Sequence, residues 1–313
     1  MSDRPWPEPL STRAIQESRG PRNPVDPRRP YAFLSEKEHS RFGVAEPVST
    51  LFLTNRECPF HCLYCDLWKN TTEETIAAGF IPEQIDWALS QLPPARHIKL
   101  YNSGNFFDPR AIPPEDWPSI ARRVQGFDTV IVENHPRLTD ERCLAFRDQL
   151  SGELEVAMGL ETIHPEVLPR LNKGMTLADF DRAVEFLGTH GIATRAFILL
   201  RPPYLSEEAG LEWALRSVEY AFARGVRFCA VIPTRGGNGI MEQLRNQGQY
   251  APPTLGTLER VLESSLAMGC GRVTVDLWDA ERLTPGEPDA TRRIARLARM
   301  NLTQRLEARF EAS

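Results

Sequence analysis

The chain has 313 residues, 41% of them hydrophobic, and its 37 Lys and Arg against 42 Asp and Glu give a formal net charge of −5. This size allows one large core or two modest ones, and the mild acidity argues against a broad nucleic-acid-binding surface, although a local basic patch stays possible. No apolar run approaches the roughly 20 residues of a membrane span, and the N-terminus lacks the charged-then-apolar layout of a signal peptide. Six cysteines, three of them close together, favour a reducing compartment, the cytoplasm by default, and a metal rather than disulfides.

Residues 1–46 are rich in Pro, Arg and Ser, as in Pro27-Arg28-Arg29-Pro30. Prolines at this density are incompatible with a regular helix or a central strand. We therefore predict an extended N-terminal arm. Its arginines could contact a phosphate-bearing substrate, but a solvated, partly disordered terminus is the more common role of such a segment.

A β-branched, apolar segment, Val48–Thr54, predicts the first strand, and Cys58, Cys62 and Cys65 follow it with the spacing C-x₃-C-x₂-C. Thiolates on one short loop can hold soft metals. A [4Fe–4S] cluster has four irons that each need an outer ligand, so three cysteines leave one iron open. A zinc site with a distant fourth ligand such as His61 is the alternative, although structural zinc usually has two separated ligand pairs. A disulfide is less expected still, because the other cysteines stand alone.

This spacing, with the aromatic Tyr64 just before the last cysteine, resembles the signature of radical S-adenosylmethionine (SAM) enzymes. The resemblance implies that Cys58, Cys62 and Cys65 hold a [4Fe–4S] cluster and that its open iron chelates the amino and carboxylate groups of SAM. Reduction then splits SAM into methionine and a 5′-deoxyadenosyl radical, with Tyr64 expected beside the adenine. The electron would come from a reducing protein such as a flavodoxin or ferredoxin.

Strand-like and helix-like segments alternate after the cysteines. The expected strands are His97–Tyr101, Thr129–Val132, Leu154–Leu160, Thr194–Leu200 and Arg227–Ile232. The expected helices are Pro82–Leu92, Glu115–Val124, Thr139–Leu150, Leu177–His190 and Ser206–Arg224. Such alternation implies a parallel sheet. We predict an α/β fold in which residues 47–236 form the partial (βα)₆ TIM-like barrel that the resemblance implies, followed by a helical C-terminal extension over residues 237–313.

Polar residues follow the predicted strands where each one ends. They are the turn Asn102-Ser103-Gly104, then Glu133, Glu161, Arg201 and Arg235. Ligands of α/β barrels bind at the carboxyl ends of the strands, so these residues should share one rim with the cysteines. By resemblance, the turn occupies the place where radical SAM enzymes bind the amino group of SAM. We also count Glu133 and Arg201 among the expected SAM contacts.

Several motifs look like the radical SAM subunit of archaeosine synthase, a family similar in turn to the Elongator catalytic subunit. They are Gly159-Leu160-Glu161-Thr162, Leu171-Asn172-Lys173-Gly174-Met175-Thr176, Leu199–Glu207, Ile232-Pro233-Thr234 and Tyr250–Pro253, and together they cover roughly half of the chain. The resemblance implies that Glu161 and Lys173 hold the ribose or carboxylate of SAM. The family is expected to follow its cysteines with a Cys-Gly-Tyr turn, whereas this chain has Cys65-Asp66-Leu67-Trp68, which points to a different substrate.

Two further groups of side chains are candidates for the site. His135 could donate a proton or contact the substrate, although a lone histidine is more often structural. Four aromatic residues could shield a radical from water and stray hydrogen donors: Phe60, Trp68, Phe106 and Phe107.

The C-terminal extension should begin with a helix through Leu255 and Leu266 and continue with a strand at Val273–Asp279. A last helix, Ala290–Phe310, carries six arginines that could contact RNA, but the acidic residues between them make a solvated face more expected.

Three functions stay open. The first is a radical SAM enzyme that abstracts hydrogen from an unidentified substrate, with a small molecule favoured. The second keeps this chemistry and acts on a tRNA, as in the resembled families, although the acidic charge and the absence of an appended RNA-binding domain weaken it. The third is a non-catalytic iron–sulfur or zinc-binding scaffold.

Overall fold

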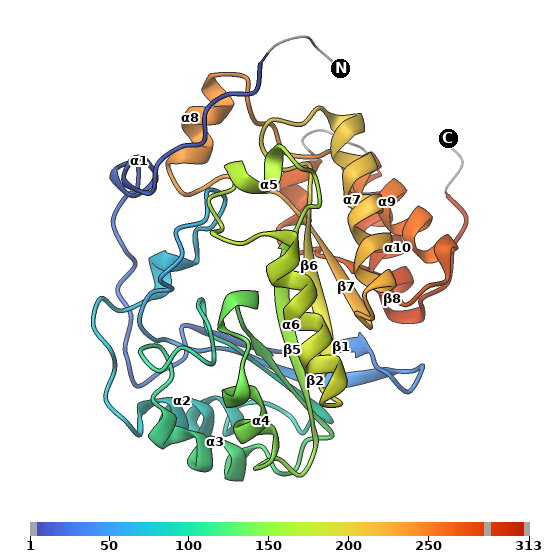
Figure 1. Cartoon of the computed structure of the whole chain (residues 1–313). Helices are drawn as coiled ribbons and strands as arrows, with labels where there is room; N and C mark the ends of the chain where they lie inside the picture. Colours follow the sequence, from blue (N-terminus) through green and yellow to red (C-terminus); the bar gives the residue numbers. More distant parts are fainter. Residues whose placement is uncertain (1–4, 285–288, 310–313) are drawn as a thin grey trace.

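Eight strands form one sheet in the computed structural model of the protein, which describes residues 5–284 and 289–309. The strands neighbour one another in chain order, β1 pairs antiparallel with β2, and all later pairs are parallel. Their bounds are β1 (Ala32–His39), β2 (Ala45–Phe52), β3 (His97–Tyr101), β4 (Thr129–Glu133), β5 (Glu153–Glu161), β6 (Ala193–Leu200), β7 (Phe228–Pro233) and β8 (Arg272–Val275). The sheet curls into a half-barrel (Figure 1).

Helices cover the convex face of this sheet (Figure 1). The longer ones are α2 (Phe80–Leu89), α3 (Trp117–Arg123), α4 (Glu141–Arg147), α6 (Leu177–Thr189), α7 (Glu207–Ala223), α9 (Leu255–Met268) and α10 (Ala290–Thr303), and the short ones are α1 (Thr12–Glu17), α5 (Val167–Arg170) and α8 (Ile240–Asn246). Alternate strand residues such as Ile98 and Leu100 are fully buried against them. None of the helices in the described ranges is both long and apolar enough to cross a membrane.

The concave face carries a buried network of charges. Lys99 of β3 donates to Glu36 at 2.9 Å and to Glu38 at 2.6 Å, both on β1. Arg195 of β6 donates to Glu38 at 2.6 and 2.8 Å and to Glu155 of β5 at 2.6 Å. Strands β1, β3 and β6 are not neighbours in the sheet, so only its curled inner face can bring these side chains together. We call these five residues the floor network.

The six predicted barrel strands are confirmed as β2 to β7, and the sheet has one further strand at each end. Strand β8 was predicted as a strand, and it joins the sheet in parallel beside β7. Strand β1 lies in the predicted N-terminal arm, where it takes the edge position that its proline-rich surroundings allow. The expectation of no regular helix in this arm was wrong at α1, because residues 12–17 contain no proline and the Ser11 side chain caps the helix.

The free edge of β8 is covered by side chains of the last helix and its end. Asn301 pairs with the N–H and C=O of Val275 at 3.0 and 2.8 Å. Gln304 does the same for Val273, at 2.8 Å in both directions. The helix α10 ends at Thr303, earlier than predicted, because Gln304 has a left-handed φ of +53°. Phe310, the predicted end, lies outside the described residues.

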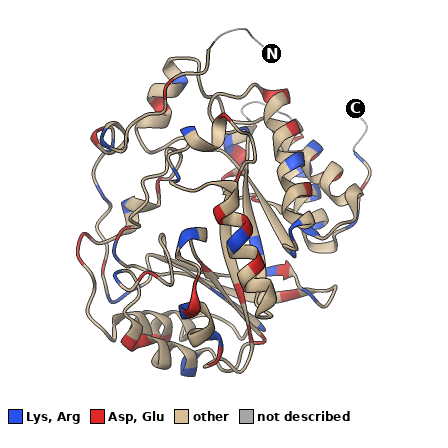
Figure 2. Cartoon of the chain, in the orientation of Figure 1, with Lys and Arg blue, Asp and Glu red and all other residues tan. Residues whose placement is uncertain are grey.

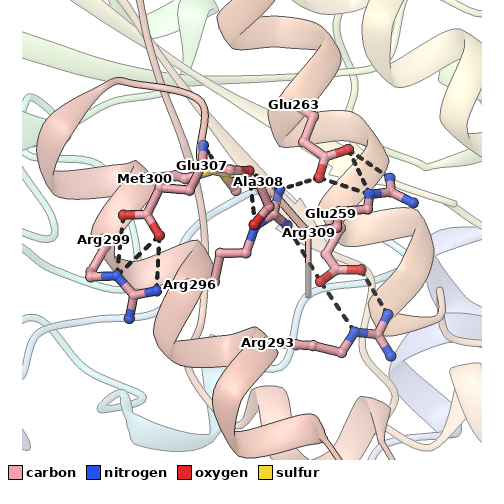
Figure 3. Close-up of polar contacts among 9 residues, drawn as sticks. All are labelled: Glu259, Glu263, Arg293, Arg296, Arg299, Met300, Glu307, Ala308 and Arg309. Carbon is pink, nitrogen blue, oxygen red and sulfur yellow. Dashed lines mark hydrogen bonds and ion pairs between the residues drawn. The ribbon is translucent and has the colours of Figure 1, made fainter. Parts of the chain in front are cut away.

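Four arginines of the last helix and of the segment after it pair with acidic residues of α9 and of that same segment (Figure 3). Arg296 is 1% exposed and donates to Glu263 at 2.5 Å and to the backbone carbonyls of Glu307 and Ala308. Arg309 also pairs with Glu263, at 2.6 Å. A solvated face was expected here, and for Arg296 that expectation was wrong, because its charge is buried and paired.

Candidate active site

The parallel register brings the predicted rim residues to one edge of the sheet. Strands β2 to β7 are parallel neighbours, so their carboxyl ends lie on the same side. The cysteine loop follows β2, the Asn102 turn follows β3, Glu133 and Glu161 are the last residues of β4 and β5, and Arg201 follows β6. The shared rim that the sequence predicted is therefore present.

The three thiols of the cysteine loop lie close together. Burial raises the pKa of Cys58 to about 12, and the neighbouring Cys62 thiol adds to that rise. Burial together with Cys62 and Cys58 likewise raises the pKa of Cys65. The Asn105 amide donates a hydrogen bond of 3.2 Å to Cys58 Sγ, which favours a thiolate there. A bound cation would favour the thiolate form of these cysteines.

A single metal ion and a [4Fe–4S] cluster make different demands on this set of donors. Within the described residues, no three His, Cys, Asp or Glu side chains converge as ligands of one ion. His61, the alternative zinc ligand, is engaged elsewhere, since its Nε2 lies 3.2 Å from Gln16 Nε2 and its Nδ1 lies 3.4 Å from Glu57. Three thiolates that each bind a different iron of a [4Fe–4S] cluster need no such convergence.

A buried ion pair stands beside the thiols. Lys173 Nζ donates to Glu161 Oε1 at 2.8 Å, and both side chains are less than a tenth exposed. Glu161 has a left-handed φ of +66° at an irregularity in the β5–β6 pairing. Burial raises the thiol pKa of both Cys58 and Cys62, and the charge of Lys173 opposes this rise. Burial and the Glu161 charge raise the pKa of Tyr64, so this phenol, predicted beside adenine, also borders the pair.

Glu133 is hydrogen-bonded to the backbone of the Asn102 turn. The Glu133 carboxylate accepts a hydrogen bond of 3.1 Å from the Asn102 backbone N–H. Burial raises the Glu133 pKa to about 7, although the backbone N–H groups of Asn102 and Ser103 oppose this shift. Both polar atoms of the Asn102 side chain are buried and have no hydrogen-bond partner within the described ranges. Buried amides are normally paired, so this amide fits a polar ligand such as the amino acid part of SAM.

Arg201 and His135 are engaged by the protein itself. The Arg201 guanidinium contacts Glu207 and donates to the Pro252 carbonyl at 2.7 Å, so its role toward SAM stays a prediction. The His135 ring stacks on Phe60 with centroids 3.7 Å apart. Its Nδ1 accepts from the Arg137 N–H, which leaves Nε2 to donate to the Lys173 carbonyl at 3.0 Å. Burial lowers the His135 pKa to about 3, so a structural role is the better interpretation.

The expected aromatic wall is only partly present. Phe106 and Phe107 are fully buried in the core beneath the helices and pack on Phe146 there. Trp68 is 4% exposed and lies under the Arg19 guanidinium. Phe60, which covers His135, remains beside the cysteines.

Aromatic residues of the strands line the concave face above the floor network, and the sequence analysis missed them. The rings of Phe52 and Tyr101 have centroids 6.1 Å apart, as do those of Tyr101 and Phe197 across the barrel. All three side chains are partly exposed. Tyr31, which precedes β1, accepts a hydrogen bond of 2.7 Å from Ser103. Strand periodicity could have indicated the inward positions of Phe52, Tyr101 and Phe197, whereas no local pattern marks Tyr31.

Curated relatives share most of the chain, although no family model matches it. An uncharacterized protein of Methanocaldococcus jannaschii, MJ0550, is 25% identical over 76% of this chain and 70% of its own. Archaeosine synthase subunit beta of Methanosarcina acetivorans is 30% identical over 72% of this chain and 68% of its own. The Thermococcus kodakarensis protein of the same name is 29% identical over 53% of each chain.

Solved structures share the fold at low identity. Methylornithine synthase (PylB) superposes with a TM-score of 0.54 and 15% identity over 80% of this chain and 69% of its own. Elp3 of Methanocaldococcus infernus gives a TM-score of 0.52 and 15% identity over 71% of this chain and 60% of its own. The half-barrel is that of radical SAM enzymes. The sequence that the chain shares with the Methanosarcina protein shows its family. The chain belongs to the archaeosine synthase subunit beta family, which has the radical SAM fold.

Proposed function

We propose that the protein is a radical SAM enzyme that abstracts hydrogen from a small organic substrate. The observation that carries this proposal is the meeting of three thiols, the buried Glu161–Lys173 pair and the unpartnered Asn102 amide at one rim. Cys58, Cys62 and Cys65 would hold a [4Fe–4S] cluster, and Asn102, Glu161 and Lys173 would contact SAM. A cluster held there would, once reduced, supply the electron that splits SAM into methionine and a 5′-deoxyadenosyl radical.

The chain's own residues have separable tasks in this proposal. The Asn105 amide and the Lys173 ammonium favour ionised thiols. Glu161 can accept hydrogen bonds from sugar hydroxyls. The Phe60 ring on His135 excludes water from one side of the cysteine loop.

The concave face supports a compact substrate. The rings of Phe52, Tyr101 and Phe197 are partly exposed there, and the charges of the floor network already pair with one another. Apolar surface with a few polar groups suits small, largely apolar molecules. The electron would come from a flavodoxin or ferredoxin in a reducing cytoplasm.

The test uses anaerobically reconstituted protein. We expect about four iron atoms per chain and 5′-deoxyadenosine formation with SAM and dithionite. Cys62→Ala should lose both, while Cys270→Ala, which changes an exposed lone cysteine, should keep both. Iron-loaded protein that yields no 5′-deoxyadenosine would overturn the proposal, and bound metal without SAM affinity would indicate the scaffold function.

A tRNA substrate is the second candidate, and the names of the archaeosine synthase relatives favour it. Phosphate contacts would make tRNA binding fall steeply with salt. Acidic and basic residues interleave along the helices in Figure 2, which favours the small-molecule substrate. Affinity for unmodified tRNA, measured at several salt concentrations, separates the two candidates. Micromolar or tighter binding that weakens steeply with salt would favour tRNA over a small molecule as the substrate.

A further inference from the structure

A segment of the N-terminal arm, residues 11–23, lies across the cysteine loop. Thr12 and Gln16 of this segment contact Asn172 and His61 at 3.2 Å each. The Asn23 N–H donates to the Lys69 carbonyl at 2.8 Å. Figure 1 shows this part of the chain running along the outside of the barrel, with α1 on the side where α8 lies. The arm is therefore attached to the loop rather than solvated.

One arginine of this segment joins the two ends of the cysteine loop. Arg22 pairs with Glu57, the residue before Cys58. The same guanidinium donates to the Trp68 carbonyl at 2.7 Å and to Thr71 Oγ1 at 2.6 Å, beyond the last cysteine. A planar guanidinium with several fixed N–H groups can make such a bridge, whereas a lysine ammonium has a single charged centre. The span between the loop ends therefore depends on Arg22.

A second arginine supports the same carboxylate. Arg19 donates to Glu57 at 2.6 Å, and the two side chains are 12% and 15% exposed. The Arg19 guanidinium also lies 4.7 Å from the centre of the Trp68 ring. Ion pairs at this depth are screened far less than surface pairs. Two arginines on one carboxylate therefore hold the residue before Cys58 from two directions.

We propose that Arg19, Arg22 and Glu57 form a clamp that fixes the span of the cysteine loop, so that these three are positioning residues for the iron–sulfur cluster. Its role toward a cluster rests on the proposed function, but its effect on the loop can be measured without metal. An arm that only covered the barrel would leave the thiols equally accessible after Arg22 is changed.

The chain contains its own reporters for the test. In metal-free protein, alkylation by iodoacetamide is followed at each cysteine by mass spectrometry. Cys270 is exposed and reports the reagent, whereas the buried Cys143 and Cys229 report global unfolding. We expect Arg22→Ala to accelerate alkylation of Cys58 and Cys65 several-fold without changing the rates at these three reporters.

Two further variants sharpen the result. Arg22→Lys keeps the charge but not the bridge, so it should behave as Arg22→Ala does. Arg28→Ala breaks another pair of the arm, Arg28 with Glu83 at 2.7 Å, and should match the wild type. Loop cysteines that react at the wild-type rate in Arg22→Ala, or that accelerate together with Cys143 and Cys229, would overturn the clamp.

Reconstitution links the clamp to the cluster. The Arg22 variants should lose iron to a chelator several-fold faster, and the EPR signal of the reduced cluster should broaden because the thiolate geometry is less uniform. An unchanged signal and unchanged iron loss would overturn the role toward the cluster. A wild type that takes up no iron would overturn the proposed function instead, whereas the alkylation result would still decide whether the clamp exists.

Discussion

At the scale of single residues, the absence of a side chain at Gly159 allows the Glu161–Lys173 pair to form. A Cβ added to Gly159 would fall within 2.5 Å of Lys173 Nζ and still closer to Glu161 Oε1. Gly159→Ala should therefore separate the pair, with a loss of about 2–4 kcal/mol in the free energy of unfolding, since each partner would remain buried. Urea denaturation of the metal-free protein measures this loss, and calorimetry of the reconstituted protein should show weaker SAM binding.

Gly188 provides the matched control. It lies in α6, and a Cβ added there meets nothing within 4 Å. Gly188→Ala should stabilise the protein by about 0.5–1 kcal/mol, because alanine is favoured over glycine in a helix. Equal unfolding free energies for the two variants would contradict the steric argument.

Glu133 should make stability depend on pH. Its pKa is raised from an ordinary value of 4.5 to about 7, chiefly by burial, while the nearby Lys173 charge opposes the rise. The folded protein then binds one proton more than the unfolded chain between these pH values. The resulting stability is fully present below pH 4.5 and is lost as the pH rises to about 7.

The change Glu133→Gln should remove this dependence. The wild type should lose about 2–3 kcal/mol between pH 4.5 and 8 from this group, and the variant should not. A glutamine oxygen can still accept the hydrogen bond from the Asn102 N–H. Urea denaturation of both proteins across this range measures the difference. If the free energies of unfolding of the two proteins change with pH in parallel, the pKa of Glu133 is not raised.

At the scale of elements, local sequence predicted the parallel strands but not the antiparallel edge strand β1. Strands β2 to β7 are apolar runs between helices, so their burial on the convex face is visible in the sequence. The sequence of β1 is typical of a charged, solvated segment, because the residues that point inward are Glu36 and Glu38. Their partners Lys99 and Arg195 lie 63 and 157 residues along the chain, and no local pattern reveals such a pairing. The clamp was missed for the same reason.

The side-chain cover of β8 should protect this strand edge from pairing with another chain. The double change Asn301→Ala and Gln304→Ala leaves the N–H and C=O groups of Val273 and Val275 unpaired. Open strand edges pair with other chains, and each buried unpaired group costs about 1–3 kcal/mol. We expect a lower melting temperature and oligomers in size-exclusion chromatography with light scattering.

The neighbouring change Arg305→Ala is the control for this prediction. Arg305 is exposed and lies next to Gln304, so its loss should leave both the melting temperature and the oligomeric state unchanged. A double variant with the wild-type mass in solution and the wild-type melting temperature would mean that water satisfies the β8 edge equally well.

At the scale of the whole molecule, the floor network places paired charges on the concave face of the half-barrel. It links β1 and β3, which are not neighbours in the sheet, with each other and with the adjacent strands β5 and β6. The apolar core lies outside the sheet, so the inner face is free to carry polar groups. The fold class was predictable from the alternation of strands and helices, whereas this separation of a charged interior from an apolar outer layer was not, because it depends on curvature.

The network should therefore carry much of the stability above pH 5. Glu38 accepts from both Lys99 and Arg195, and its side chain is 14% exposed. Burial would raise its pKa, but these two cations lower it well below the ordinary value of 4.5. A carboxylate with a depressed pKa contributes stability above its unfolded pKa and loses that contribution as the pH falls. Glu38→Gln should cost about 3–5 kcal/mol at pH 7, because Lys99 and Arg195 both lose a charged partner while they remain buried.

The difference in the free energy of unfolding between wild type and Glu38→Gln should decrease as the pH falls below about 4.5, because protonation of Glu38 makes the wild type resemble the variant. Urea denaturation at pH 7, 5 and 4 follows this change. The control Glu17→Gln alters an exposed pair with Arg13 and should shift the unfolding free energy by less than about 0.5 kcal/mol. If this difference in the free energy of unfolding is the same at all three pH values, the shape of the Glu38 side chain, rather than its charge, stabilises the packing of β1 on the barrel.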